Sequence, residues 1–269
     1  MSPIQCLGTA AILAALSVRP ALATSIVILR SSTEVVVGAD STRTLRDPQN
    51  SFVRSVCKIV PAGGLLFVAA GLTFANGVEV ADLAQKASAR QRGTAAANDP
   101  NASMDDFRQR VHPFLISAFA AQSRLDWTRG EREQGRVALE VAYIGFSGGR
   151  TSVVVEKYRA VGRTGPDIRV LAERRVYNSD TLGRYTYIFL GVHRTIDKHM
   201  ASGSEQVYTA AGASRAIYRL ISQEESTSSG STGGAIDIAS LGPHGIRWFQ
   251  SKRGCAVPYD VTDVHPAMR

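Results

Sequence analysis

Two apolar, β-branched runs near the start of the chain constrain its fold more than any other feature. One run covers residues 24–30 and the other residues 34–40, and only a short polar break at residues 31–33 separates them. Runs of this kind favour strands, and the short break favours a hairpin. Because a hairpin brings the end of its second strand beside the start of its first, Asp40 is predicted to lie near Thr24.

The residues before the first run have the pattern of a cleaved export signal. Residues 6–18 are apolar and uncharged, and Ala21-Leu22-Ala23 is the small-residue pattern after which signal peptidase cuts. The apolar run is also too short to cross a bilayer comfortably. We therefore expect residues 1–23 to be a signal peptide and the mature chain to be exported, periplasmic or secreted, with no stable membrane span. The alternative is an N-terminal extension that stays attached, because the first five residues lack Lys and Arg.

Cleavage after Ala23 would leave Thr24 at a free N-terminus. A hydroxyl and an α-amine on one residue form a nucleophile with its own base. Asp40 follows an apolar strand and is expensive to bury unless it is paired, so Lys58, at the start of the next apolar run, is its predicted partner. A lysine held by a carboxylate would help proton transfer at the hydroxyl. The plainer alternative is an ordinary strand threonine and a strand-edge lysine.

The rest of the chain groups strands and helices into separate runs, which favours an α+β fold in one domain, residues 24–251, followed by a polar tail, residues 252–269. Residues 41–54 are predicted to be a loop, and residues 160–183 have no clear assignment. The remaining predicted strands cover residues 58–60, 65–71, 137–146, 151–159, 185–190, 235–241 and 245–249. The predicted helices cover residues 77–90, 107–124 and 204–221.

Charge and cysteine content narrow the classes of function. The formal net charge is +8, but the basic residues are dispersed without interleaved aromatic residues, so no nucleic-acid partner is expected. No Cys and His residues stand at metal-ligand spacing, and no cofactor is expected. Residues 230–234 are glycine-rich but lack the Gly-Lys-Ser/Thr ending of a phosphate loop, which excludes that kind of NTPase. Whether Cys57 and Cys255 pair stays open.

Five short segments along the chain belong together as one pattern. They are Thr24-Ser25-Ile26-Val27, Gly38-Ala39-Asp40-Ser41, Lys58-Ile59, Ala70-Gly71-Leu72-Thr73 and Gly233-Gly234-Ala235-Ile236-Asp237. In this order and spacing they resemble proteasome β-type subunits and the bacterial proteasome-like proteases of the N-terminal-nucleophile (Ntn) hydrolase superfamily. The resemblance extends from Thr24 to about Phe249, and it implies a four-layer αββα Ntn-hydrolase sandwich and assembly into a homo-oligomeric ring.

The resemblance also implies a role for each matching residue. Thr24 is the nucleophile, Asp40 the buried carboxylate, Lys58 the lysine between them, and Gly71 the glycine whose N–H stabilises the oxyanion. Thr232 takes the place of a supporting hydroxyl, and Ser229 stands where the family has an aspartate. A second departure is Gly191-Val192-His193 in place of a Ser-Gly-Ser element, with His193 in the space of the missing serine.

These features predict an exported threonine peptidase or amidohydrolase that cleaves peptide or other amide bonds through an acyl-enzyme on Thr24. Its substrate would be a peptide or a small amide. The alternative is a catalytically silent proteasome-like assembly or binding protein, because a fold can persist after its activity is lost.

Overall fold

The structure is a computed structural model that describes residues 24–46, 51–91, 93–94, 98–120, 135–162, 167–178, 185–203, 206–227, 232–252 and 255. The predicted signal peptide, residues 1–23, lies outside the described residues. So do Ser229 and most of the predicted tail.

Sheet I contains the strand that follows Thr24. Its strands are antiparallel, in the order β12-β1-β2-β13-β14. The predicted hairpin is confirmed, because β1 pairs with β2 from Ile26 opposite Ala39 to Arg30 opposite Val35. Both strands are buried along their whole length, which explains why their sequences are continuously apolar rather than alternating. The bounds are β1 Ser25–Arg30, β2 Val35–Ala39, β12 Thr186–Gly191, β13 Asp237–Gly242 and β14 Gly245–Gln250.

Sheet II packs against sheet I and supplies the other half of the central core. Its strands are also antiparallel, in the order β11-β10-β9-β6-β5. Apolar side chains of β6, β9 and β10 meet those of β1, β2 and β13 between the two sheets. The bounds are β5 Ile59–Ala62, β6 Leu65–Gly71, β9 Arg136–Ser147, β10 Arg150–Val161 and β11 Arg169–Tyr177.

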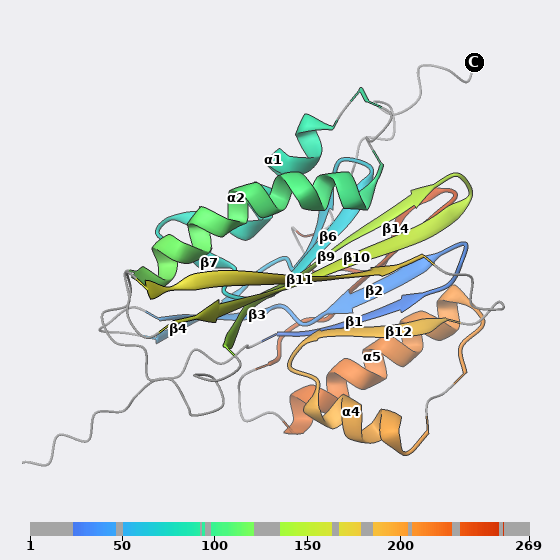
Figure 1. Ribbon diagram of the computed structural model, residues 1–269. Coiled ribbons are helices and arrows are strands. Elements are labelled where there is room, and N and C mark those ends of the chain that lie inside the picture. The colour runs from blue at the N-terminus through green and yellow to red at the C-terminus, as the bar shows by residue number, and fades with distance from the viewer. Residues whose placement is uncertain are drawn as a thin grey trace, which may run out of the picture.

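Helices lie on the faces of the two sheets that point away from the central core (Figure 1). Helices α1 (Val80–Arg90) and α2 (Pro100–Ala120) pack on sheet II, and α5 (Ala210–Thr227) packs on sheet I with α4 (Arg194–Ala201) beside it. Within the described residues, no helix combines the length and the apolar character needed to cross a membrane.

Two small ribbons complete the described structure. β3 (Thr42–Arg46) pairs with β4 (Ser51–Ser55), and β7 (Phe74–Ala75) pairs with β8 (Val78–Glu79). The prediction of a loop over residues 41–54 is therefore wrong. These residues are polar, but a ladder of backbone hydrogen bonds needs no apolar face, so hydrophobic periodicity does not reveal it.

Although helices cover the outer faces of sheets I and II, the fold-class prediction, a four-layer αββα Ntn-hydrolase sandwich, is also wrong. The described chain is mostly antiparallel β structure, in which strand residues outnumber helical residues and the strands form four separate sheets. The difference comes from strands that the pattern did not reveal. The β3–β4 ribbon replaces a predicted loop, and β11 adds an exposed edge strand from a segment without a clear assignment.

Candidate active site

The carboxylate of Asp40 is the centre of the site. Asp40 follows β2 directly and is fully buried. Its Oδ1 accepts hydrogen bonds from the Ser25 N–H and the Lys58 Nζ, both at 2.8 Å, and its Oδ2 accepts one from the Gly233 N–H at 3.1 Å. The predicted pairing of Asp40 with Lys58 is therefore present. The carboxylate also touches the residue immediately after Thr24, as the hairpin geometry predicts.

Lys58 lies just before β5 and is only 7% exposed. Burial lowers the pKa of Lys58 from 10.5 to about 8, against the opposing attraction of Asp40, and the nearby charges of Arg43 and Lys252 lower it further. A group with a pKa close to neutrality can give and take protons during a reaction. The ammonium of Lys58 thus has the electrostatic character of a group that assists proton transfer.

Thr24 precedes β1 and is held by the turn that follows β12. Its carbonyl oxygen accepts the Val192 N–H at 2.7 Å. Gly191 has a φ of +79°, and a Cβ on it would lie 2.0 Å from the Thr24 oxygen, so only glycine fits this close approach. The same Cβ would lie 3.0 Å from the Cβ of Ala70. The end of β6 therefore lies against this turn.

Gly71, the predicted oxyanion donor, ends β6 directly after Ala70. Its φ of +106° lies in the region that favours glycine. The N–H of the following residue, Leu72, bonds to the carbonyl of Ala138 at 2.8 Å, which fixes the chain as it leaves the strand. The structure thus places Gly71, the last residue of β6, directly after the Ala70 that packs at the Gly191 turn.

The segment before β13 contributes the third side of the site. The carbonyl of Gly233 accepts hydrogen bonds from both the N–H of Thr42, at 2.9 Å, and its hydroxyl. Thr232 is buried beside this contact, and its hydroxyl has no partner among the described residues. The predicted supporting residue Thr232 is therefore adjacent to the Asp40 network, whereas Ser229 lies outside the described residues.

His193, which was predicted to occupy the space of the missing serine, contacts side chains of α4 and β12. Its Nδ1 lies 2.9 Å from Oδ2 of Asp197, one turn into α4. Its ring packs against Phe189 of β12, with the ring centroids 5.8 Å apart. These contacts fix the ring against α4 and β12.

Two acidic residues of the site were not predicted. Glu225 on α5 has its pKa raised by burial and by the charge of Asp40, while Lys58 acts in the opposite direction, so its carboxyl group lies within electrostatic reach of the pair. Glu140 on β9 accepts the Gly191 N–H at 2.6 Å. The only available signal for Glu140 was a charged residue in the middle of an otherwise apolar strand.

A disulfide joins Cys57 to Cys255 and answers the pairing question that the sequence left open. Cys57 immediately precedes Lys58, so the bond fastens the end of the described chain beside the catalytic candidate. Lys252, in the same terminal segment, donates its N–H to Asp237 at 2.6 Å and its Nζ to the hydroxyl of Ser55 at 2.8 Å.

In the part of the chain that the structure describes, no group of three or more His, Cys, Asp or Glu side chains is placed to hold a metal ion. Neither the protein-family models nor the curated proteins with which the chain was compared gave a match.

Proposed function

We propose that this protein is an exported hydrolase that uses Thr24, freed at the N-terminus, to cleave peptide or other amide bonds. The observation that carries the proposal is the buried Asp40 carboxylate. It holds Lys58 and the backbone of Ser25 on the same oxygen, each at 2.8 Å. Asp40 thereby holds Lys58, whose pKa is lowered, near the start of β1, the strand that follows Thr24.

The reaction follows from these positions. The Thr24 hydroxyl attacks the amide carbonyl, and its proton passes to the α-amine of the same residue. The ammonium of Lys58 favours the developing alkoxide, and the Gly71 N–H stabilises the oxyanion. The C–N bond then breaks, the leaving amine takes the proton, and water hydrolyses the ester on Thr24. Resemblance to the Ntn hydrolases supports these roles.

The proposed chemistry does not depend on which fold class carries the site. Catalytic constellations recur on unrelated folds, so function is judged from the site and not from the sheets that carry it. What the proposal needs is a free Thr24 beside a buried carboxylate–lysine pair. Asp40 and Lys58 are both less than a tenth exposed, which is an unusual place for two charges without a role.

We also propose that the protein is exported and that it assembles into a ring, and these two proposals have different support. The disulfide between Cys57 and Cys255 supports export, because such bonds persist in oxidising compartments and are rare in the reducing cytosol. Assembly into a homo-oligomeric ring rests on the resemblance alone. Mass measurement of the native protein in solution decides it.

The rate of acylation should rise with pH to a maximum and then fall. An N-terminal α-amine ordinarily has a pKa of about 8, and burial places that of Lys58 at about 8 as well. The amine accepts the hydroxyl proton only in its neutral form, so the labelling rate of Thr24 should increase about tenfold per pH unit below this value. Above it the rate should fall again, because the Lys58 ammonium that favours the alkoxide loses its proton. Labelling reactions that are quenched at timed intervals between pH 5 and 9.5 measure this rate. A rate independent of pH over this range would contradict the proposed base.

The proposal is tested by treating the exported protein with an electrophile that requires both a hydroxyl and a neighbouring amine, followed by peptide mapping. A covalent adduct on Thr24 is the expected result. A folded protein that begins at Thr24 and takes no label would instead favour the silent binding protein. The departures from the family pattern at Val192-His193 and at Ser229 favour that rival.

A further inference from the structure

Glu140 is a buried carboxylate that points at the turn holding Thr24. It lies on β9 with Ala142 and Ile144 at alternate positions, and those two side chains belong to the core between the sheets. Because side chains alternate along a strand, Glu140 also faces sheet I. There its Oε2 accepts the N–H of Gly191 at 2.6 Å.

Gly191 connects Glu140 to the nucleophile by direct contact. Gly191 lies opposite Ser25 in the β1–β12 ladder, and it lies so close to the Thr24 carbonyl that a side chain at position 191 would not fit. The next N–H, that of Val192, donates to the same carbonyl at 2.7 Å. A shift of Glu140 would therefore move the turn that holds the backbone of Thr24.

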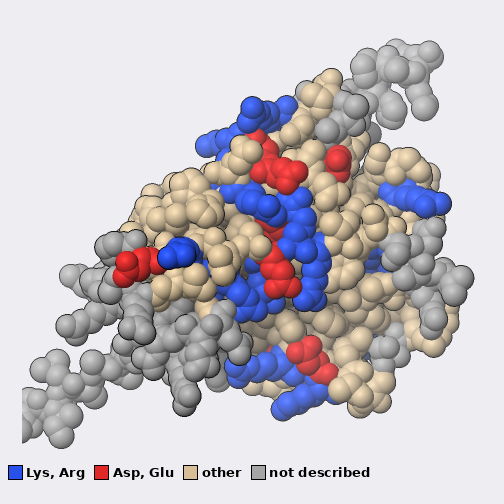
Figure 2. Space-filling view, in the orientation of Figure 1, with Lys and Arg blue, Asp and Glu red and all other residues tan. Residues whose placement is uncertain are grey.

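The second oxygen of Glu140 is also engaged. Its Oε1 lies 2.6 Å from the Nζ of Lys157, the residue directly opposite on β10. Lys157 in turn lies opposite Glu173 on β11, which pairs with Arg175 at the exposed edge of the sheet. Figure 2 shows charged side chains of both signs gathered in the middle of the face where β11 lies. Glu140 is thus the buried end of a row of side chains whose charges alternate in sign: Glu140, Lys157, Glu173 and Arg175.

We propose that Glu140 is a positioning residue for the reaction at Thr24. Through its hydrogen bond to Gly191 it sets the turn that fixes the nucleophile, and Lys157 stabilises its charge. This inference rests on the proposed function. It concerns the placement of an acceptor oxygen, so it predicts that the length of the side chain matters more than its charge.

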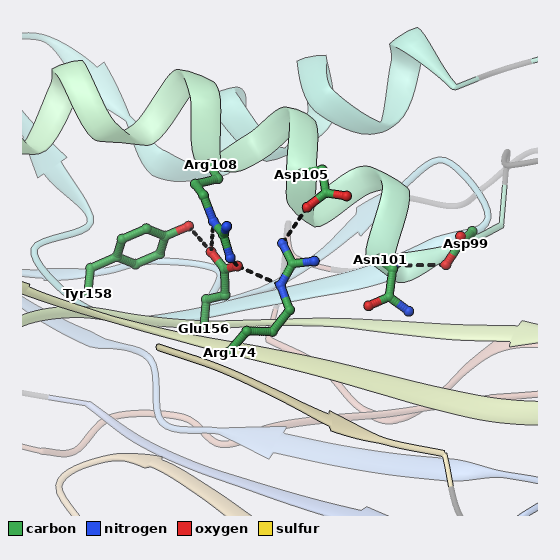
Figure 3. Close-up of polar contacts among 7 residues, drawn as sticks. All are labelled: Asp99, Asn101, Asp105, Arg108, Glu156, Tyr158 and Arg174. Atoms are coloured by element: carbon green, nitrogen blue, oxygen red, sulfur yellow. Dashed lines mark hydrogen bonds and ion pairs between the residues drawn. The ribbon is translucent and has the colours of Figure 1, made fainter. Parts of the chain in front are cut away.

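Glu156 offers a matched control on the neighbouring strand. It is fully buried on β10, next to Lys157, but points to the other face of sheet II, under α2. Figure 3 shows its carboxylate accepting hydrogen bonds from Arg108, Arg174 and the hydroxyl of Tyr158. Glu156→Gln therefore removes a buried, ion-paired carboxylate without touching Gly191.

The experiment compares Glu140→Gln, Glu140→Asp and Glu156→Gln in the full-length exported protein. The probe is the electrophile that labels Thr24, and the maximal labelling rate is separated from the concentration giving half that rate. Gln keeps an oxygen at the same distance, and its rate should stay within about fivefold of wild type. Asp keeps the charge but withdraws the oxygen by one methylene, and its maximal rate should fall about 100-fold with half-saturation unchanged.

Glu156→Gln should lower the thermal midpoint and leave the labelling rate unchanged. The inference is overturned if Glu140→Asp labels as fast as Glu140→Gln, or if Glu156→Gln slows labelling as much as Glu140→Asp does. Failure of the proposed function gives a different result, because the wild-type protein itself would then take no label on Thr24.

Discussion

Thr24→Ala is expected to abolish turnover and leave the folded structure intact. The substitution removes the attacking oxygen but keeps the backbone carbonyl that Val192 binds. Loss of a catalytic nucleophile typically lowers kcat by factors of about 10⁴ to 10⁶. Thr24→Ser keeps a hydroxyl on the terminal residue and should retain measurable acylation. Both variants are compared with wild type for hydrolysis of a small amide and for labelling by the electrophile.

The difference in activity between Thr24→Ala and Thr24→Ser tests whether Thr24 is the nucleophile. If Thr24→Ala hydrolyses the amide as fast as wild type, the nucleophile is elsewhere and the mechanism is wrong. Circular dichroism and a thermal scan show whether the alanine variant is folded, so a loss through unfolding is distinguished from a loss of chemistry.

Asp40→Asn is expected to reduce both stability and activity strongly. The amide cannot offer a negative charge to Lys58, whose Nζ would remain buried at the same position. Breaking a buried ion pair by removing one partner destabilises a protein by about 3–5 kcal/mol. Equilibrium urea unfolding measures this loss, and the labelling assay measures the loss of activity in the folded fraction.

A double variant separates the ion pair from its surroundings. Asp40→Asn combined with Lys58→Met removes both charges, so its loss of stability should be smaller than the sum of the two single losses. The exposed pair Glu173–Arg175 provides a comparison, since surface pairs contribute little, and Glu173→Gln should leave the unfolding midpoint unchanged. Strictly additive losses for the Asp40 and Lys58 variants would show that the two side chains do not interact in solution.

Local patterns in the sequence predicted the part of the structure that holds the site. The β1–β2 hairpin follows from two apolar runs with a short break, and the ladder brings Asp40 beside Ser25 without any long-range information. Electrostatics then predicted the partner of Asp40, because a buried carboxylate needs a cation and Lys58 begins the next apolar run.

The features that escaped prediction depend on contacts between distant segments. The bond from Gly191 to Glu140 spans 51 residues, and the disulfide spans 198. The exposed edge strand β11 has no buried face along most of its length, so its hydrophobic pattern is weak. The same weakness concealed the β3–β4 ribbon, which forms a small sheet separate from sheets I and II.

The proposed mechanism requires Thr24 to be the first residue of the working protein. The most direct measurement is the intact mass and the N-terminal sequence of the protein after expression with export. We expect a chain that begins at Thr24, with the hydroxyl and its base on one residue. A chain that keeps Met1, or begins anywhere other than Thr24, would contradict it, because the α-amine that serves as base would then be absent from the site.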